Sequence, residues 1–474
     1  MPKKQTVAQY QVNRKYEGLG NLVQIEAPLM GLATNLDNTK REPTHAQEIF
    51  GLPDLKYGWT NIPRETTTNQ EAFDFYTFNV PVDVIVGIKG SCIYLLDLKE
   101  LEVLYFFRFE EVEPKTAIIL NDIAFACLVP GLGSPLRVFF WPTNTINIYN
   151  QNGNVLGFFK GRLFIGDGKI LRFSGTAITD PSFQGDPFAS ENGGGYLVLQ
   201  HPQVSEILYL VPYEDMLYIF TDGGLFVLTV SLASNAPSTF YILDTGIRMN
   251  FKKSKPIIVF DKLAVLSNLG MFWIKGLQLE RFDWPIADQI WRLDFKKAGV
   301  VNYQGQKIIT IPSIQDNISV GYSVEYNQFF YFPFKIINGI YNSDNTSFSF
   351  PPDDYIQILF AKEEYYPFKY TSVLHDLNQP RFKFIKNLKL NGKGHLLVDF
   401  LYDIYGLKQS EFYIQTGSDY LEFRSHIGRK GYKIGFSIYT PDDYLDFAFV
   451  SKIYMKIHLL GPINWFYYVG YQND

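Results

Sequence analysis

Four acidic residues that lie near one another in the sequence are the best candidates for chemistry. Asp180, Asp186 and Glu191 fall in one polar loop, and Asp222 follows a nearby apolar run. Two carboxyl groups held about 5 to 9 Å apart can hydrolyse a glycosidic bond. Asp180 and Asp186 each precede a proline, however, and such pairs form turns because Asp bonds its own backbone and Pro fixes φ. We therefore interpret these residues as turn formers and predict no catalytic residue and no enzyme.

Residue types that bind metals or nucleotides are not grouped in this chain. The six histidines are widely spaced, without HxH or HExxH, so no zinc site is predicted. The pairs Asp353-Asp354 and Asp442-Asp443 lack EF-hand spacing and are expected to lie in solvated loops. No P-loop, GxGxxG or GxSxG motif occurs. We expect no metal and no cofactor.

Charge and cysteine content exclude further classes of protein. The formal net charge is -5, and the longest basic clusters are Lys3-Lys4 and Lys252-Lys253-Ser254-Lys255, which predicts no stable nucleic-acid binding. Cys92 and Cys127 lie in apolar runs and are expected to be buried free thiols. The N-terminal residues lack the apolar region of a secretory signal, and no run of 18 apolar residues predicts a membrane span. We expect the protein to stay in a cytoplasm or to be built into a particle there.

The elements around these residues are predicted to be strands. Phe and Tyr fit pleated surfaces, and aromatic residues make up 17% of the chain. Strand-length apolar runs recur from residue 73 onward, beginning with residues 73–80, and turns separate them every eight to twelve residues. Asp-Gly turns between apolar runs, at Asp167-Gly168 and Asp222-Gly223, predict hairpins because a primed turn needs positive φ.

Many short strands with such turns indicate a sandwich, a barrel or a propeller, and a loose repeat favours the β-propeller. Strand–turn–strand units recur as RLFIGDGKILRF, MLYIFTDGGLFVLTV and KLAVLSNLGMFWIKG. Their turn glycines Gly168, Gly223 and Gly270 are about fifty residues apart, which is near the length of a four-stranded blade.

Three regions are predicted along the chain. Residues 1–72 are polar and read as an extended N-terminal arm, and residues 73–366 read as the propeller. A short amphipathic helix is expected near 286–296, because Ile286, Ile290 and Leu293 recur at helical spacing. Residues 367–474 read as a C-terminal β-sandwich-like module. Its aromatic end, with Trp465, Phe466, Tyr467 and Tyr468, is the candidate subunit interface.

In the order of its motifs, the chain resembles the tail hub or tail nozzle proteins of short-tailed (podovirus-type) phages, a β-propeller family. The matching segments, in order, are GRLFIGDGKILRFSGTAITDP, MLYIFTDGGLFVLTV, LAVLSNLGMFWIKG, PIADQIWRL, GQKIITIPS and YSVEYNQFFYFP. NLVQIEAPLMGLATNLDNTKREPTHAQEIFGLPDLKYGW is similar to the family's N-terminal segment, and FYIQTGSDYLEFR and GYKIGFSIYT are similar to its C-terminal module. Glu325 and Phe330 depart from the family's usual Asp and Trp.

The resemblance implies a structural subunit of the virion tail, assembled in the host cytoplasm. Such a subunit would form a homo-oligomeric ring, expected to be a hexamer, below the portal adaptor ring. It would hold tail spike, fibre or needle proteins outside, retain packaged DNA and conduct it at ejection. The alternatives that the residues leave open are a carbohydrate- or host-surface-binding propeller and, less favoured, a glycosidase.

Overall fold

The computed structural model describes most of the chain. Its described residues are 20–32, 45–54, 58–110, 112–131, 133, 135–229, 239–352, 354–377, 382–403, 421–424 and 431–460. Within these ranges the chain forms strands and short 3-10 turns, and no α-helix. Among the same residues, no helix has the length and hydropathy needed to cross a membrane. The chain divides into two compact units, one of Glu65–Ser319 with Lys335–Leu359 and the other of Met1–Arg64, Val320–Phe334 and Phe360–Asp474.

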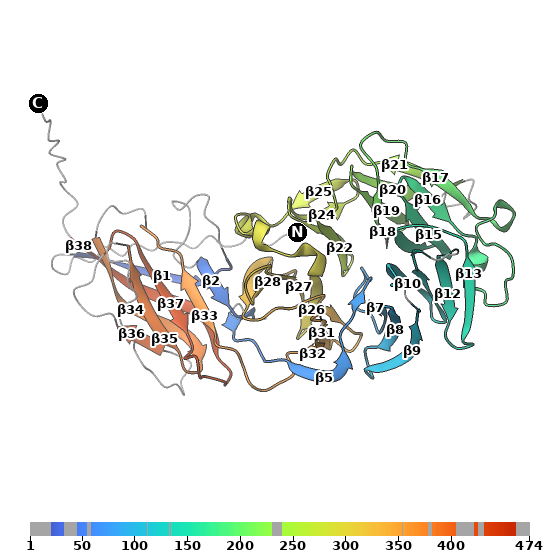
Figure 1. Cartoon of the computed structure of the whole chain (residues 1–474). Coiled ribbons are helices and arrows are strands. Elements are labelled where there is room, and N and C mark those ends of the chain that lie inside the picture. The colour runs from blue at the N-terminus through green and yellow to red at the C-terminus, as the bar shows by residue number, and fades with distance from the viewer. Residues whose placement is uncertain are drawn as a thin grey trace, which may run out of the picture. The chain divides into compact units, whose positions relative to one another are not determined.

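The first unit consists of antiparallel sheets whose strands follow one another along the chain (Figure 1). Five such sheets have four strands each, and the first two are β6 (Asp74–Phe75), β7 (Val84–Lys89), β8 (Cys92–Asp97) and β9 (Glu102–Arg108), then β10 (Thr116–Asn121), β11 (Ala124–Leu128), β12 (Leu136–Phe140) and β13 (Thr145–Tyr149). The third sheet is β14 (Val155–Phe159), β15 (Arg162–Asp167), β16 (Ile170–Phe173) and β17 (Gly195–Val198), and the fourth is β18 (Ile207–Tyr213), β19 (Met216–Thr221), β20 (Leu225–Thr229) and β21 (Tyr241–Asp244). The fifth is β22 (Ser254–Val259), β23 (Lys262–Ser267), β24 (Gly270–Lys275) and β25 (Gln278–Arg281).

The hairpin of β26 (Gly299–Tyr303) and β27 (Gln306–Pro312) comes next, followed by a sheet with a distant member. In that sheet β30 (Ile340–Tyr341), β31 (Ser347–Ser349) and β32 (Tyr355–Leu359) are joined by β5 (Thr66–Glu71). An early segment of the unit thus completes the sheet formed by its last strands.

These sheets close into a ring. The strands β7, β10, β14, β18, β22, β26 and β30 contact one another in that order, and Figure 1 shows their sheets side by side around a common centre. The ends of the ring meet in one hydrophobic cluster, where Phe73 and Phe75 pack with Phe348 and Phe350. The chain is therefore an all-β protein with a β-propeller-like arrangement of four-stranded sheets.

The predicted hairpin turns are confirmed. Gly168 has a φ of +56° between β15 and β16, a left-handed conformation that glycine adopts without steric cost. The Asp222-Gly223 turn joins β19 to β20, and the amide of Thr221 donates to the carbonyl of Gly224. Gly270 opens β24 after the turn from β23. The three repeated units are therefore the central hairpins of three consecutive sheets.

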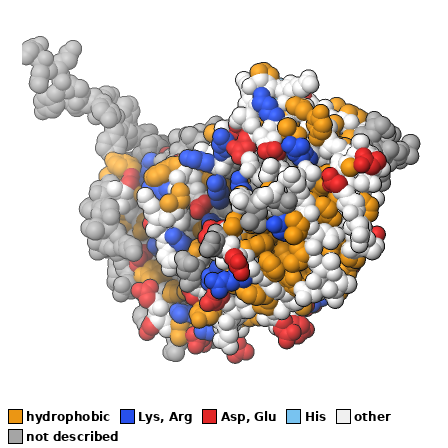
Figure 2. Space-filling model, turned by 45° about the vertical axis from the view of Figure 1, so that its right-hand side comes forward, with side chains coloured by type: hydrophobic (Ala, Val, Ile, Leu, Met, Phe, Trp, Pro, Cys, Tyr) orange, Lys and Arg blue, Asp and Glu red, His pale blue; other side chains and the backbone are white. Residues whose placement is uncertain are grey.

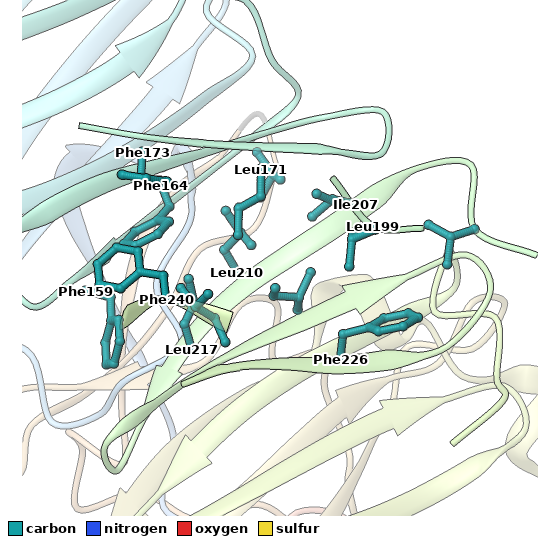
Figure 3. Packing of buried hydrophobic residues seen from close by; sticks show 14 residues of the cluster. Phe159, Phe164, Leu171, Phe173, Leu199, Ile207, Leu210, Leu217, Phe226 and Phe240 are labelled. Carbon is teal, nitrogen blue, oxygen red and sulfur yellow. The ribbon is translucent and has the colours of Figure 1, made fainter. Parts of the chain in front are cut away.

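Neighbouring sheets are held together by apolar side chains from their facing sides. Between β14–β17 and β18–β21, Phe164 and Leu171 lie opposite Leu210 and Leu217 (Figure 3), and all four side chains are fully buried. Full burial of such a side chain contributes about 1.5 to 3 kcal/mol, so these clusters are a main source of stability.

The second unit contains two groups of paired strands. The first has the order β3 (Leu52–Pro53), β4 (Trp59–Thr60), β38 (Phe449–Leu460), β34 (Phe382–Lys393), β36 (Leu421–Arg424), with β1 (Gly20–Pro28) also on β38. The second has the order β29 (Gln328–Phe332), β2 (Ala46–Phe50), β33 (Lys369–Ser372), β37 (Ile434–Tyr439), β35 (Leu397–Tyr402), and β28 (Ser319–Ser323) precedes β29 in the chain.

The expected domain boundaries at residues 72 and 366 differ from these units. Residues 20–28, 46–53 and 59–60 supply strands β1 to β4 instead of only an extended arm, and β5 belongs to the propeller unit. β29 lies in the unit that also contains the C-terminal strands. β1 pairs with β38, far away in sequence, and β5 consists of polar residues, TTTNQE, so the residues next to these strands do not predict where they pair.

The predicted helix near 286–296 is wrong. The segment forms three separate 3-10 turns, η4 (Trp284–Ile286), η5 (Ile290–Arg292) and η6 (Phe295–Lys297). Ile286, Ile290 and Leu293 are buried, as their spacing predicts, but Leu293 is extended because it forms a β-bridge with Ser313. The bridge interrupts the helical backbone after a single turn.

Candidate functional site

The centre of the propeller contains two cavities and the chain segment that separates them. The cavities have volumes of about 620 and 370 Å³. Residues of the inner strands β7, β10 and β18 line the larger one, and residues of β10, β14, β18 and β22 line the smaller one. Tyr76, Thr77 and Phe78 line both, so the segment between β6 and β7 crosses the propeller channel at this level.

Backbone hydrogen bonds hold this segment in the channel. The amide of Ile258 donates to the carbonyl of Phe78 at 2.7 Å, and the amide of Val82 donates to the carbonyl of Tyr341 at 3.1 Å. The Phe78 ring packs edge-on against Tyr209, with 6.0 Å between ring centroids. Residues 73–80 were expected to form one strand, but only Asp74–Phe75 pairs as β6, because the following residues bond to β22 instead.

The larger cavity is mainly apolar, and its lining also includes Asp83 and Asp122. Its lining includes Ile85, Ile119, Trp141 and Leu210. Burial opposes the ionisation of Asp83, but hydrogen bonds from Ser343 and the nearby Lys99 lower the pKa of its carboxyl below the ordinary value. Asp83 thereby joins the loop after β30 to the start of β7.

The smaller cavity is cationic. Its lining includes four lysines, Lys115, Lys255, Lys296 and Lys297, and one carboxylate, Asp74. Lys297 Nζ lies 2.7 Å from Asp74 Oδ1. Lys255 Nζ donates to the carbonyl of Ala298 at 2.6 Å and to Asn338 Oδ1 at 3.2 Å. Burial and repulsion by Lys297 lower the pKa of Lys255 to about 8.

The four acidic residues that sequence analysis weighed as an acid–base pair form local contacts. Asp180 Oδ1 accepts from the amide of Ser182 at 2.8 Å, and Asp186 Oδ1 accepts from the amide of Phe188 at 3.0 Å. These are the contacts of turn formers. The third, Glu191, lies in the 3-10 turn η2 (Ser190–Asn192).

Asp222 holds two loops together. Its Oδ1 accepts from the amides of Ser205 at 2.8 Å and Glu206 at 3.1 Å, and its other oxygen accepts from the Ser205 hydroxyl. These hydrogen bonds lower the pKa of Asp222, although burial opposes its ionisation. The Asp-Gly turn is thereby tied to the segment that precedes β18.

Among the residues that the structure describes, no three His, Cys, Asp or Glu side chains form a group that could hold a metal. Asp353 and His426 lie outside the described residues. Cys92 and Cys127 are free thiols, as expected, but Cys127 is buried and Cys92 is partly exposed. Burial raises the pKa of Cys127 far above its ordinary range. That thiol is protonated and buried, so it is not a reactive nucleophile.

Hydrophobic side chains also gather on the surface, and Figure 2 shows a patch of them bordered by charged groups on the face in view. In the propeller unit, Trp284 and Trp291 are 56% and 64% exposed. Arg281 lies 4.3 Å from the ring centroid of Trp284, and Arg292 lies 4.8 Å from that of Trp291. Sequence analysis did not single out these tryptophans. Both fall outside the apolar stripe of Ile286, Ile290 and Leu293, and this position could have predicted their exposure.

The candidate interface residues Trp465, Phe466, Tyr467 and Tyr468 lie outside the described residues. Their role in subunit contacts stays a prediction.

Comparison with known proteins gives no family. No family model matches the chain, and no curated protein matches it. One similar solved structure is titled "Crystal Structure of Mitotic Checkpoint Complex", with 13% identity over 69% of this chain and 97% of that chain and a TM-score of 0.39. Another is the β-propeller domain of Cps50 (Swd1) from Myceliophteria thermophila, with 10% identity over 64% of this chain and 100% of that chain and a TM-score of 0.43. The propeller-like arrangement stated above follows from the strand order and ring closure of this chain.

Proposed function

We propose that this chain is a structural subunit of a phage tail nozzle and that it forms a ring extending the portal and adaptor channel. The observation that supports the proposal is an ordered set of motifs that resembles the motifs of the tail hub family. Three of these motifs fall on the central hairpins β15–β16, β19–β20 and β23–β24 of consecutive sheets. Their order therefore reflects the order of repeated structural units.

In this proposal the work of the protein is mechanical. The ring retains packaged DNA and conducts it at ejection, and no residue needs to be catalytic. The Phe78 segment crosses the propeller's own channel, so DNA would pass through the hole of the ring and not through a single propeller. The formal net charge of -5 disfavours stable binding of a polyanion.

The mass of the purified protein in solution tests the proposal. Light scattering combined with negative-stain imaging is expected to show a ring of about six chains of 54.6 kDa each, with a central hole. If the subunits assemble only on the adaptor ring, the ring is expected to appear only after the adaptor ring is added. A monomer in both conditions would overturn the nozzle proposal.

A carbohydrate- or host-surface-binding propeller is the second candidate, and the exposed Trp284 and Trp291 favour it. Each ring has an arginine on one face, and large rigid aromatic rings are common anchors of binding surfaces. Glycan-array binding with a micromolar Kd that Trp291→Ala abolishes would support this candidate. Turnover of a polysaccharide that Asp180→Asn abolishes would instead revive the glycosidase.

A further inference from the structure

The smaller cavity of the propeller has the composition of an anion site. We name it the lysine pocket and define it by Lys115, Lys255, Lys296, Lys297 and Asp74. Lys115 precedes β10, Lys255 lies in β22, Lys296 and Lys297 lie in η6, and Asp74 lies in β6. Distant parts of the chain thus bring four ammonium groups to one cavity, although like charges repel one another.

Neighbouring carboxylates offset only part of this positive charge. Asp74 pairs with Lys297 at 2.7 Å, and Asp74 and Asp294 both favour the charged form of Lys255. Among the residues that line the cavity, the four lysines face the single carboxylate of Asp74. The other polar contacts are neutral, since Lys115 donates to Asn154 Oδ1 at 2.5 Å and Lys255 donates to Ala298 and Asn338.

The geometry leaves donors for a ligand. An ammonium group carries three N–H bonds, and the two acceptors of Lys255 use two of them. Tyr76 also lines the pocket, and burial together with Asp74 raises the pKa of its hydroxyl, which therefore stays a neutral donor at pH 7. A volume of about 370 Å³ lies at the lower end of the range of small-molecule sites, about 300 to 1,000 Å³.

We propose that the lysine pocket binds a compact oxyanion of the phosphate class, either free phosphate or the phosphate group of a small phosphomonoester. Charge-assisted hydrogen bonds from ammonium groups to phosphate oxygens are strong, and a phosphate accepts several of them at once. The bound anion would offset the repulsion between the positive charges of Lys255 and Lys297. The site is independent of ring formation and holds for either function proposed above.

Thermal unfolding and titration calorimetry of the full chain test the site. Sodium phosphate is the probe, and sodium chloride at equal ionic strength corrects for screening. Phosphate is expected to raise the Tm of the wild-type protein above the chloride value, because a ligand that binds the native state stabilises it. Glycerol phosphate in a parallel titration distinguishes the sources, since tighter binding of either probe identifies free phosphate or the ester.

Two substitutions locate the binding. Lys255→Met is expected to weaken phosphate binding about tenfold or more, since it removes a charged donor inside the cavity. Lys297→Met provides a second variant in case Lys255→Met does not fold. The matched control is Lys253→Met, which removes the same charge from an exposed neighbour outside the lining and should leave binding unchanged. Equal phosphate affinity in the wild type, Lys255→Met and Lys297→Met, or no phosphate binding to the wild type, would overturn the proposal.

Discussion

The backbone amide of Ile258 donates a 2.7 Å hydrogen bond to the carbonyl oxygen of Phe78. This bond joins the segment after β6 to the inner strand β22, and Asn79 forms a parallel β-bridge with Ile258. Phe78 also packs against the hydrophobic cluster that contains Val211, Phe220 and Val265. Backbone and side-chain contacts therefore fasten the segment to the inner strands of the propeller.

Phe78→Ala is predicted to destabilise the protein by about 2 kcal/mol, because it removes a half-buried ring that contacts Tyr209. Urea unfolding should show a lower midpoint with an unchanged slope. The matched control is Phe106→Ala on the outer strand β9, where the ring is 52% exposed. An equal loss of stability in both variants would show that the Phe78 ring contributes no more to stability than an exposed ring.

Lys255 is predicted to make stability depend on alkaline pH. The pKa of Lys255 is lowered to about 8 from its ordinary value of 10.5 by burial and by Lys297. Between these values the unfolded state binds more protons than the native state, so this residue's contribution to the free energy of unfolding rises with pH. The stability of the wild type relative to Lys255→Met should increase by about 1 kcal/mol between pH 7 and pH 9.

Urea titrations of the wild type and Lys255→Met, in chloride buffers at each pH, measure this difference. Taking the difference between the two proteins removes the contributions of groups that titrate equally in both, including Lys383, whose pKa is also lowered to about 8 by burial. Lys253→Met is the control, and its stability relative to the wild type should not change with pH. A constant difference for Lys255→Met would show that Lys255 keeps its ordinary pKa in the folded protein.

Arg162 is predicted to hold the long loop between β16 and β17. Its Nη1 donates to the carbonyls of Ser174 at 2.8 Å and Gly193 at 2.6 Å, at the two ends of that loop. Arg162 is only 7% exposed, and removing a charged donor from buried carbonyls costs about 2 to 3 kcal/mol. Arg162→Met should therefore lower stability by that amount and speed amide hydrogen exchange across residues 176–192.

The control for the loop is Arg172→Met. Arg172 lies 3.5 Å from Asp167 in a partly exposed pair, and such pairs contribute about 0 to 1 kcal/mol. Faster exchange in the loop is expected for Arg162→Met alone. If exchange in the loop stays slow in Arg162→Met, the loop's own hydrogen bonds, such as Gly175 to Pro187, suffice to hold it.

Local sequence signals predicted the central hairpins but not the elements formed over long distances. Asp167-Gly168 carries its own turn geometry, so β15 and β16 follow from neighbouring residues alone. β5 is polar and becomes a strand only by pairing with β32. The residues around Phe78 have strand-like composition, yet they cross the channel because Ile258 bonds to them.

Neighbouring residues in the sequence indicate even less about the lysine pocket. Lys255 was recognised only as part of a short basic cluster, Lys252-Lys253-Ser254-Lys255. Lys253 is exposed in the turn before β22, whereas Lys255 lies in β22 and lines the cavity. Lys115 and Lys297 join Lys255 only when the ring closes, and spacing along the chain cannot show such a meeting.

The C-terminal aromatic residues lead to the last prediction. If Trp465 is an anchor of the subunit interface, Trp465→Ala should cost about 2 kcal/mol per contact and shift the ring to smaller species in light scattering. Trp291→Ala is the matched control, because Trp291 is an exposed tryptophan of the propeller unit whose indole donates to the carbonyl of Asp288 within its own turn. If the rings persist in Trp465→Ala and dissociate in Trp291→Ala, the subunit interface lies on the propeller and includes Trp291. Rings that persist in both variants would leave neither tryptophan as an anchor.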